Sequence, residues 1–315
     1  MTETSPSSQK APVSAETLME RWYATRKPAS ESAAPPVAAS SKGMRIAIQG
    51  EPGSFSHEAA LKLVADATVV PCAVSADVFA ALNSGAVDAA AIPIENCIAG
   101  SVLEHFDLLL ASDVTVVRET QLHIRHNLIV APGTKIEAVE RVFSHPVALA
   151  QCKRFLAEHT GMRSYAFYDT AGSVKQLMEL GDRNAAAIAS EAAAHCYGAE
   201  ILRAHIEDNP ENYTRFFLVR RAAEATTDPN ANKISVAFAL EHRPGTLVSA
   251  LSELASIGTN LTKIESRPVM GKPWEYIFYV DCLITSMEQA ERAIEALSHH
   301  CTMVKELGRY RDEWR

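Results

Sequence analysis

Short apolar runs alternate with segments of helical periodicity along most of the chain. From Met44 onward, runs such as "RIAIQ" and "AAAIPI" are separated by Ala- and Leu-rich stretches such as "SHEAALKLVAD" and "SADVFAALNSG". A second block, from His126, repeats this order and begins with "HNLIVAPG". Because strands that alternate with helices are typical of α/β units, we predict a mostly parallel sheet in each block, and two similar lobes with a cleft between them.

A different order of elements begins at Lys233. The pattern predicts, in sequence, a strand over "ISVAFALE", a helix over "PGTLVSALSELASIG", strands over "LTKIESRPV" and "WEYIFYVDCL", a helix over "SMEQAERAIEALSHH" and a strand near "TMVKELGRY". This βαββαβ order is that of a small ferredoxin-like domain. We therefore expect a two-lobed unit over residues 44–222, a polar linker over 223–232 and a final domain over 233–310.

Residues 1–43 are rich in Ser, Ala and Pro. Such a composition buries too little apolar surface to offset its ordering entropy, so we predict a disordered arm. Within it, "SAETLMERWYATR" has the periodicity of one or two amphipathic helical turns. Its acidic residues argue against an organellar targeting segment.

Composition narrows the function classes. Hydrophobic residues make up 47% and charged residues 22% of the chain, as in ordinary soluble domains. The net charge of −8 argues against nucleic-acid binding. The six cysteines have no metal-ligand spacing, which predicts reduced thiols in a cytoplasmic protein. The apolar runs are far shorter than the roughly 20 residues that span a bilayer, so we predict no membrane segment.

Polar residues follow several predicted strands, where ligands bind in open α/β sheets. Glu95 and Asn96 end the run "IPIEN", and Ser101 either caps the following helix or binds a ligand. After "VFS", Ser144 is read first as a helix cap, with Gln151 further along. Three helix N-termini aimed at one cleft would suit a polyanionic small molecule.

Two further turns have the same arrangement. In "QGEPGSFS", Ser54 is expected to cap the next helix, and a capped turn is a better interpretation than an anion site. In "YDTAGS", Thr170 ends a strand before a helix that opens at Gly172.

The stretch "NYTRFFLV" adds a hydroxyl and a cation to a predicted strand. Thr214 and Phe216 are expected on one face and Arg215 on the other, unless a bulge re-aims it. Arg215 either grips a carboxylate or ties the two lobes together through an internal ion pair, and the internal role is favoured.

Taken together, these motifs resemble the prephenate dehydratase family from about Arg45 to about Arg309. The resemblance rests on "GEPGSFS", "IPIENCIAGSV", "FSHPVALAQC", "YDTAGS", "AIASEAAAHCYGAEIL" and "EDNPENYTRFFLV" in this order. The segment "RPGTLVSALSELASIGTNLTKIESRP" resembles the ACT regulatory domain of these enzymes. The implied fold is a two-lobed catalytic unit similar to periplasmic binding proteins, followed by an amino-acid-sensing domain.

The resemblance implies a reaction that converts prephenate to phenylpyruvate, water and carbon dioxide in phenylalanine biosynthesis, with no metal or organic cofactor. It places Thr214 at the catalytic centre as a donor to the departing hydroxyl, with Glu95 as the alternative acid and Asn96 beside them. The implied substrate-binding residues are Ser54, Ser101, Ser144, Gln151, Thr170, Arg215 and Phe216. Cys97 and Val147 stand where family members commonly carry other residues, so the resemblance defines the individual substrate contacts less closely than the reaction.

The final domain is expected to bind phenylalanine as an inhibitor between the subunits of a homodimer or homotetramer. The implied binding residues are Gly245, Thr246, Leu247, Val248, Asn260, Leu261, Glu265, Ser266, Arg267 and Pro268. Thr246 replaces the usual Ala, which gives weight to a domain that only holds the oligomer together. Two other functions stay open: an arogenate dehydratase, and a non-catalytic amino-acid or keto-acid sensor.

Overall fold

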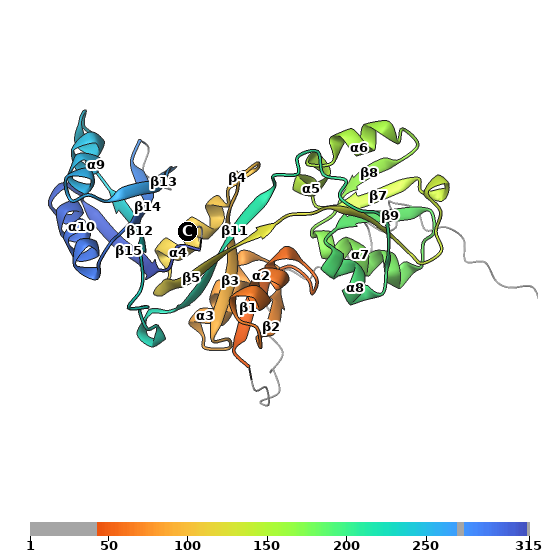
Figure 1. Cartoon of the computed structure of the whole chain (residues 1–315), viewed down its shortest axis with the longest axis horizontal. Helices are drawn as coiled ribbons and strands as arrows, with labels where there is room; N and C mark the ends of the chain where they lie inside the picture. Colours follow the sequence, from red (N-terminus) through yellow and green to blue (C-terminus); the bar gives the residue numbers. More distant parts are fainter. Residues whose placement is uncertain (1–42, 270–273, 314–315) are drawn as a thin grey trace, which may run out of the picture. The chain divides into compact units, whose positions relative to one another are not determined.

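The computed structural model describes residues 43–269 and 274–313, which fall within one compact unit (Figure 1). The predicted arm therefore lies outside the described residues, apart from Gly43, and so does the predicted turn "MGKP". The described residues form three sheets, each with its own helices.

The first sheet has strand order β2-β1-β3-β11-β5, with the short β4 paired to β3. Its strands are β1 (Arg45–Gln49), β2 (Thr68–Cys72), β3 (Ala89–Asn96), β4 (Gly100–Ser101), β5 (Val114–His123) and β11 (Tyr213–Arg221). Its helices are α2 (Phe55–Leu63), α3 (Ser75–Asn83) and α4 (Leu103–Ala111). The run from Ala89 to Ile92 is fully buried, because helices or other elements cover both faces of this central strand.

The second sheet has strand order β10-β6-β9-β7-β8. Its strands are β6 (Asn127–Val130), β7 (Arg141–Ser144), β8 (Arg163–Ala166), β9 (Ala185–Ala189) and β10 (Glu200–Arg203). Its helices are η1 (Ile136–Ala138), α5 (Pro146–Ala150), α6 (Lys153–Glu158), α7 (Thr170–Leu180) and α8 (Glu191–Tyr197).

Both sheets are mixed, so the expectation of mostly parallel sheets is wrong. In the first sheet β1 pairs in parallel with β2 and β3, whereas β11 is antiparallel to both β3 and β5. In the second sheet β6 is antiparallel to β9 and β10. The physical reason is the chain path: β5 leads out of the first sheet, the second sheet is built, and β11 returns in the opposite direction.

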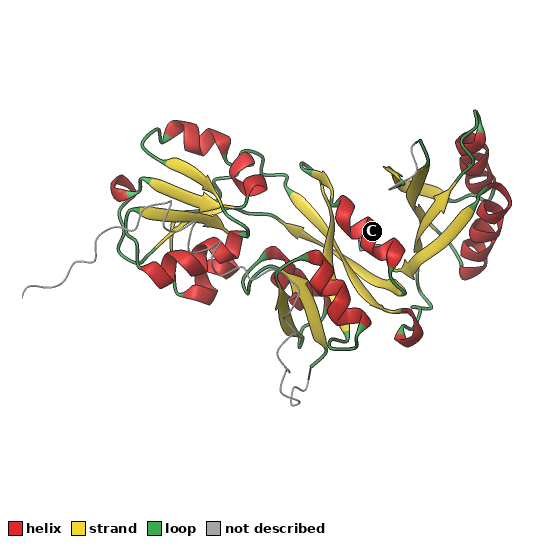
Figure 2. Ribbon diagram, turned by 180° about the vertical axis from the view of Figure 1, so that it is seen from behind, coloured by secondary structure: helices red, strands yellow, loops and turns green. Residues whose placement is uncertain are grey.

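The third sheet confirms the βαββαβ order. Its elements are β12 (Lys233–Ala239), α9 (Thr246–Ser256), β13 (Asn260–Pro268), β14 (Tyr276–Leu283), α10 (Met287–His300) and β15 (Met303–Tyr310), and η2 (Ala222–Glu224) precedes it. The strand order is β13-β14-β12-β15, all antiparallel. Helices α9 and α10 lie side by side against the sheet (Figure 2) and bury a core that includes Phe238 and Leu254.

The third sheet packs directly on the first. Phe217 of β11 and Tyr279, Leu307 and Tyr310 of the third sheet belong to one buried cluster. A Cβ added at Gly308 would lie 2.2 Å from the carbonyl oxygen of Val116, so β15 and β5 meet backbone to backbone. The last domain therefore shares its core with the first sheet.

Candidate active site

Thr214 and Asn96 are cross-strand neighbours at one end of the first sheet. Thr214 in β11 pairs with Asn96 in β3 on one side and with Leu122 in β5 on the other. The Asn96 Nδ2 lies 2.9 Å from the Thr214 Oγ1. Only 9% of Thr214 is exposed. The strand-end positions noted in the sequence therefore meet in space.

The backbone fixes the orientation of the Asn96 amide. Its Oδ1 accepts from the backbone N–H groups of Ile98 at 3.0 Å and Ala99 at 2.7 Å. The Nδ2 must then be the donor to Thr214, whose oxygen accepts. Thr214 therefore keeps its own hydroxyl proton, for which no described residue is an acceptor. A donor hydroxyl is the property that a departing oxygen requires.

Three more residues extend this hydrogen-bonded cluster into the second lobe. The Asn96 Nδ2 also donates to the Asn212 Oδ1 at 2.8 Å, and the Asn212 Nδ2 donates to the Gln151 Oε1 at 3.0 Å. The His126 Nε2 lies 2.8 Å from the same Gln151 oxygen. We call Thr214, Asn96, Asn212, Gln151 and His126 the amide network.

The loop before β11 holds Gln151 in place. The backbone N–H of Asp208 donates to the Gln151 carbonyl at 2.7 Å, and the Asp208 carboxylate accepts from the first N–H groups of α6. Gln151 itself is the C-cap of α5. The backbone of Gln151 is therefore held between the end of α5 and the loop before β11.

Sequence reasoning missed Asn212 and His126. Asn212 is completely buried and His126 is 2% exposed. Asn212 stands two positions before Thr214, so the period-2 alternation of an extended chain was an available signal. His126 precedes the apolar run "NLIV" and had no comparable signal, because its partner comes from another element.

Glu95 and Ser101 lie away from the amide network. The Lys263 Nζ lies 2.9 Å from the Glu95 Oε1 and donates to the Ser101 Oγ at 2.8 Å. Ser101 in turn donates to the Glu265 Oε2 at 2.6 Å. Neighbouring side chains in β3 point to opposite faces, so Glu95 faces the third sheet while Asn96 faces Thr214. Glu95 as the acid stays a prediction.

The expectation that Ser101 caps the following helix is wrong, because Val102 is the N-cap of α4. Gly100 and Ser101 form β4, paired to β3, and α4 begins at Leu103. The extra two-residue strand delays the helix, since its backbone groups are already paired across the turn with Glu95 and Asn96.

Arg215 forms the internal ion pair that the sequence favoured. Its guanidinium lies 2.6 Å from the Glu119 Oε2, 2.5 Å from the Asp281 Oδ2 and 3.0 Å from the Tyr310 hydroxyl, with 7% of the side chain exposed. The pair joins the first sheet to the third rather than tying the two lobes together. This part of the expectation was wrong, because β11 is central to the first sheet and its far face meets the last domain.

Phe216 lies in the core with 1% exposure. The register between β11 and β3 shifts between Arg215 and Phe216, which is the bulge considered from the sequence. Direct contact of either side chain with substrate stays a prediction.

The predicted serine and threonine contacts have local partners. Ser54 caps α2 by accepting from the His57 N–H at 3.3 Å, as expected. Ser144 does not cap α5: its hydroxyl donates to the Ile188 carbonyl at 2.5 Å, and His145 is the cap. The reason is that Pro146 occupies the first helical position, which makes the residue before it the cap.

Thr170 is the first residue of α7, so the helix starts two positions earlier than predicted. Asp169 is the cap, because its Oδ1 accepts from the Gly172 N–H at 2.7 Å. The roles of Ser54, Ser144 and Thr170 toward a substrate stay predictions.

The loop after β1 contacts the second lobe. Glu51 accepts from the Tyr168 hydroxyl at 3.0 Å and pairs with the Lys175 Nζ at 3.0 Å. The Ser190 hydroxyl donates to the Gly53 carbonyl at 2.6 Å. Gly53 has a φ of +84°, and a Cβ there would lie 2.7 Å from the Ala193 Cα. The glycine is therefore required for this close approach.

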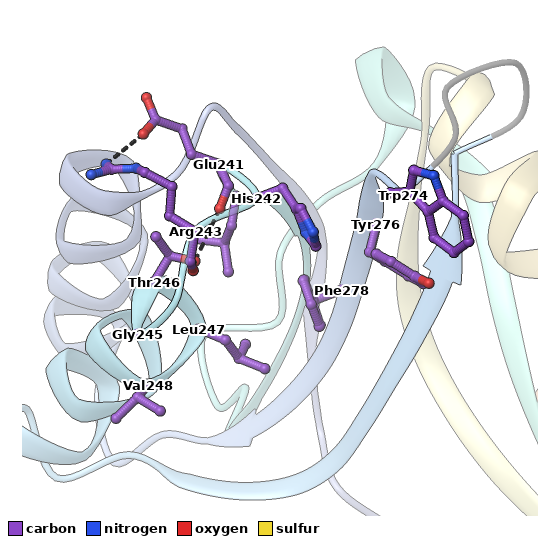
Figure 3. A pocket seen from close by; sticks show the side chains of 11 residues that line it. Glu241, His242, Arg243, Gly245, Thr246, Leu247, Val248, Trp274, Tyr276 and Phe278 are labelled. Atoms are coloured by element: carbon purple, nitrogen blue, oxygen red, sulfur yellow. Dashed lines mark hydrogen bonds and ion pairs between the residues drawn. The ribbon is translucent and has the colours of Figure 1, made fainter.

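The third sheet carries a pocket at the start of α9 (Figure 3). Four predicted regulatory residues line it, Gly245, Thr246, Leu247 and Val248. Aromatic side chains complete the wall, namely His242, Trp274, Tyr276 and Phe278. The Thr246 hydroxyl donates within the turn, to the carbonyls of Glu241 and Arg243.

The other predicted regulatory residues belong to β13 and are not part of the lining described for this pocket. These are Asn260, Leu261, Glu265, Ser266, Arg267 and Pro268. Glu265 contacts Ser101, and Arg267 pairs with Asp107 of α4. Ser266 and Pro268 are nevertheless the cross-strand partners of the lining residues Phe278 and Tyr276, so this end of β13 lies next to the pocket without being part of its lining.

Over the residues that the structure describes, no group of three His, Cys, Asp or Glu side chains is arranged to hold a metal ion. No helix in those ranges is long and apolar enough to cross a membrane. The fold and the amide network together define an α/β protein with a donor hydroxyl at a strand end, a place where small ligands bind.

Comparisons with known proteins identify the family. The prephenate dehydratase family model matches residues 46–224. Arogenate dehydratase/prephenate dehydratase 2 of Arabidopsis thaliana is 38% identical over 277 residues, which cover 85% of this chain and 72% of the relative. The chain therefore belongs to the prephenate dehydratase family, as its motifs predicted.

Two solved structures resemble this one over most of its length. The prephenate dehydratase of Arthrobacter aurescens, in complex with L-Phe, is 31% identical with a TM-score of 0.78, and the match covers 85% of this chain and 90% of that one. GqqA, described as a novel type of quorum quenching acylase, is 32% identical with a TM-score of 0.78 over 86% and 98% of the two chains.

Proposed function

We propose that the protein is a prephenate dehydratase that forms phenylpyruvate, water and carbon dioxide in phenylalanine biosynthesis. The observation that carries this proposal is the Thr214 hydroxyl, which accepts from Asn96 and therefore has its proton to donate. Membership of the family and the name of the Arabidopsis relative, which includes both dehydratase activities, support it.

The reaction needs little from the enzyme beyond orientation and one donor. The electrons of the bond to the ring carboxylate move into the ring as carbon dioxide leaves, and the electrons of the C–O bond leave with the oxygen, which takes up a proton to become water. An alcohol is a very weak acid, so Thr214 supplies a hydrogen bond to the departing oxygen. Removal of such a transition-state donor costs about 10²- to 10³-fold in rate.

Arogenate is the alternative substrate, and it carries an ammonium group in place of the keto group. The departing hydroxyl and carboxylate are the same, so the donor geometry serves both molecules. A non-catalytic sensor is the remaining alternative. It would have no need for a threonine hydroxyl held as a donor, and it would bind without turnover.

The test incubates the full-length protein with prephenate and with arogenate separately and measures phenylpyruvate and phenylalanine. We expect phenylpyruvate from prephenate. Thr214→Val, which removes the hydroxyl at nearly constant volume, should lose most turnover, while Thr214→Ser keeps much of it. Thr120→Val is the matched control, because Thr120 is fully buried in the neighbouring β5 and its hydroxyl has no described partner. Absence of turnover with prephenate would refute the proposal, and turnover of arogenate alone would support the alternative substrate.

We further propose that the domain over residues 233–310 is an ACT regulatory domain that binds phenylalanine. The pocket in Figure 3 offers aromatic walls for a phenyl ring, and the N-terminal amides of α9 suit a carboxylate. The Arthrobacter structure, solved with L-Phe, supports this effector. In a homodimer or homotetramer, β13 of a second subunit would complete the site.

Inhibition requires a coupling free energy of about 1–3 kcal/mol between the two sites. The ion pair between Lys263 of β13 and Glu95, the neighbour of Asn96 in β3, supports such a coupling. A phenylalanine titration of the full chain should inhibit turnover, and Trp274→Ala, at a side chain that is 74% exposed, should weaken inhibition without unfolding the protein. The full chain is needed, since truncation would uncover the shared core. No inhibition of the intact protein would refute the assignment.

A further inference from the structure

We propose that His126 is a positioning residue that holds the Gln151 side chain in the orientation in which its oxygen accepts from Asn212. The proposal rests on the proposed dehydratase activity for its kinetic readout only. The geometry behind it concerns the amide network itself, and it can be tested whether or not the chain turns over prephenate.

The direction of every hydrogen bond in the network follows from two backbone groups. The N–H groups of Ile98 and Ala99 make the Asn96 Oδ1 an acceptor, so its Nδ2 donates. The Asn212 Oδ1 must then accept from Asn96, which leaves the Asn212 Nδ2 as a donor to Gln151. The Gln151 Oε1 is therefore an acceptor, and its Nε2 faces the Asn96 Oδ1 at 3.5 Å.

His126 is the last residue in this series of hydrogen bonds. The Gln151 Oε1 already accepts from Asn212, so the His126 Nε2, 2.8 Å away, must carry the proton. A neutral ring with Nε2–H leaves Nδ1 as a lone pair. The Nδ1 is buried and has no partner among the described residues, which favours an unprotonated nitrogen there.

The surroundings keep the ring neutral and in place. Burial lowers the pKa of His126, against the opposing effects of the Gln151 hydrogen bond and the Glu207 charge. Glu207 is engaged by the His126 backbone N–H at 2.9 Å and by Arg125 at 3.0 Å. The ring meets Phe55 edge to face, with centroids 5.8 Å apart.

Without the His126 donor, the Gln151 amide loses the contact that distinguishes its oxygen from its nitrogen on that side. A rotated Gln151 would present its NH₂ group to the Asn212 Nδ2, so that two donors face each other. Asn212 cannot compensate by rotating, because Asn96 is fixed by the backbone. Among the described residues, Asn212 would then be the single remaining donor to the Gln151 oxygen, and the Gln151 side chain, one of the implied substrate-binding groups, would be held less firmly, whereas Asn96 stays fixed by the Ile98 and Ala99 N–H groups.

The kinetic test uses three variants of the full chain with whichever substrate the wild type turns over. We expect His126→Leu to lower kcat about tenfold, the equivalent of one buried hydrogen bond, with a smaller change in KM. His126→Gln, whose amide nitrogen reaches the Nε2 position, should recover most of kcat. His195→Leu, at an exposed histidine, is the matched control and should match wild type.

A double-mutant cycle separates positioning from simple loss of packing. If His126 acts through Gln151, His126→Leu combined with Gln151→Leu loses no more kcat than Gln151→Leu alone. Additive losses, or a His126→Gln variant as slow as His126→Leu, would overturn the proposal.

The tautomer provides a readout that is independent of turnover. Imidazole ¹⁵N shifts of labelled protein should show His126 with the proton on Nε2 in the wild type, and a mixture of tautomers in Gln151→Leu. A proton on Nδ1 in the wild type would overturn the proposal even for an active enzyme. Failure to turn over either substrate would instead refute the proposed function and leave this result intact.

Discussion

Arg215→Met should be among the most destabilising single substitutions in this chain. The guanidinium neutralises Glu119 and Asp281, which are 1% and 4% exposed. Lys233 is the other cation of the cluster, 2.9 Å from Glu119 and 3.2 Å from Asp312. After the substitution, one lysine would face three buried carboxylates.

The magnitude follows from two opposing terms. At an effective dielectric constant of about 20, each contact at the observed separations contributes about 6 kcal/mol of Coulomb energy. Desolvation of the three groups offsets most of this gain, and the measured cost of breaking such a buried pair is about 3–5 kcal/mol. Burial acts to raise the pKa of both carboxyls: Arg215, Ser235 and Lys233 together hold the pKa of Asp281 below its ordinary value, whereas the pKa of Glu119 stays above its ordinary value despite Arg215 and Lys233.

The assay is urea unfolding of the full chain, with the free energy of unfolding taken from the midpoint and slope. Arg183→Met, the same change at an exposed arginine, should alter stability by less than about 0.5 kcal/mol. Arg215→Met combined with Asp281→Asn should be more stable than Arg215→Met alone, because one orphaned charge is gone. A loss below about 1 kcal/mol for Arg215→Met would refute the reasoning.

Acid should destabilise the fold below about pH 6.5, because burial lowers the pKa of His105 and His126 in the folded state and the unfolded chain then binds protons that the folded chain does not. The free energy of unfolding should therefore rise with pH through this range. A urea midpoint that does not change with pH would contradict this expectation. Gly308→Ala should cost about 1–3 kcal/mol by overpacking, since its Cβ would meet the Val116 carbonyl at 2.2 Å, whereas Gly161→Ala, with open space around it, serves as the control. Equal midpoints for these two variants would show that β15 and β5 can separate at no cost.

Local patterns were sufficient for most elements of the fold. The alternation of apolar runs predicted most strands and helices of the three sheets, although β4 and β5 were not among them, and the βαββαβ order of the last domain was confirmed element by element. The direction of β11 was not predictable in this way, because periodicity reports which residues are buried and not which strand they pair with. Only the pairing of β11 with β3 and β5 defines it.

The site was predictable within a strand and not between lobes. Alternation along β3 and β11 already separates Asn96 and Thr214 from Glu95 and Arg215, so two faces with two roles were available from the sequence. The contact of Gln151 with Asn212 and His126 depends on how the second lobe meets the first. No local pattern contains that information.

The docking of β15 on β5 bears on the order in which the chain folds during synthesis. The Thr115 hydroxyl donates to the carbonyl of Leu307, 192 positions later, and Glu119 pairs with Lys233, 114 positions later. Contacts so distant in sequence form slowly, because the entropy of closing a long loop must be overcome first. During synthesis, β5 therefore lacks its contacts with β15 until nearly the whole chain has emerged from the ribosome. Until then the Glu119 carboxylate also lacks its contact with Lys233.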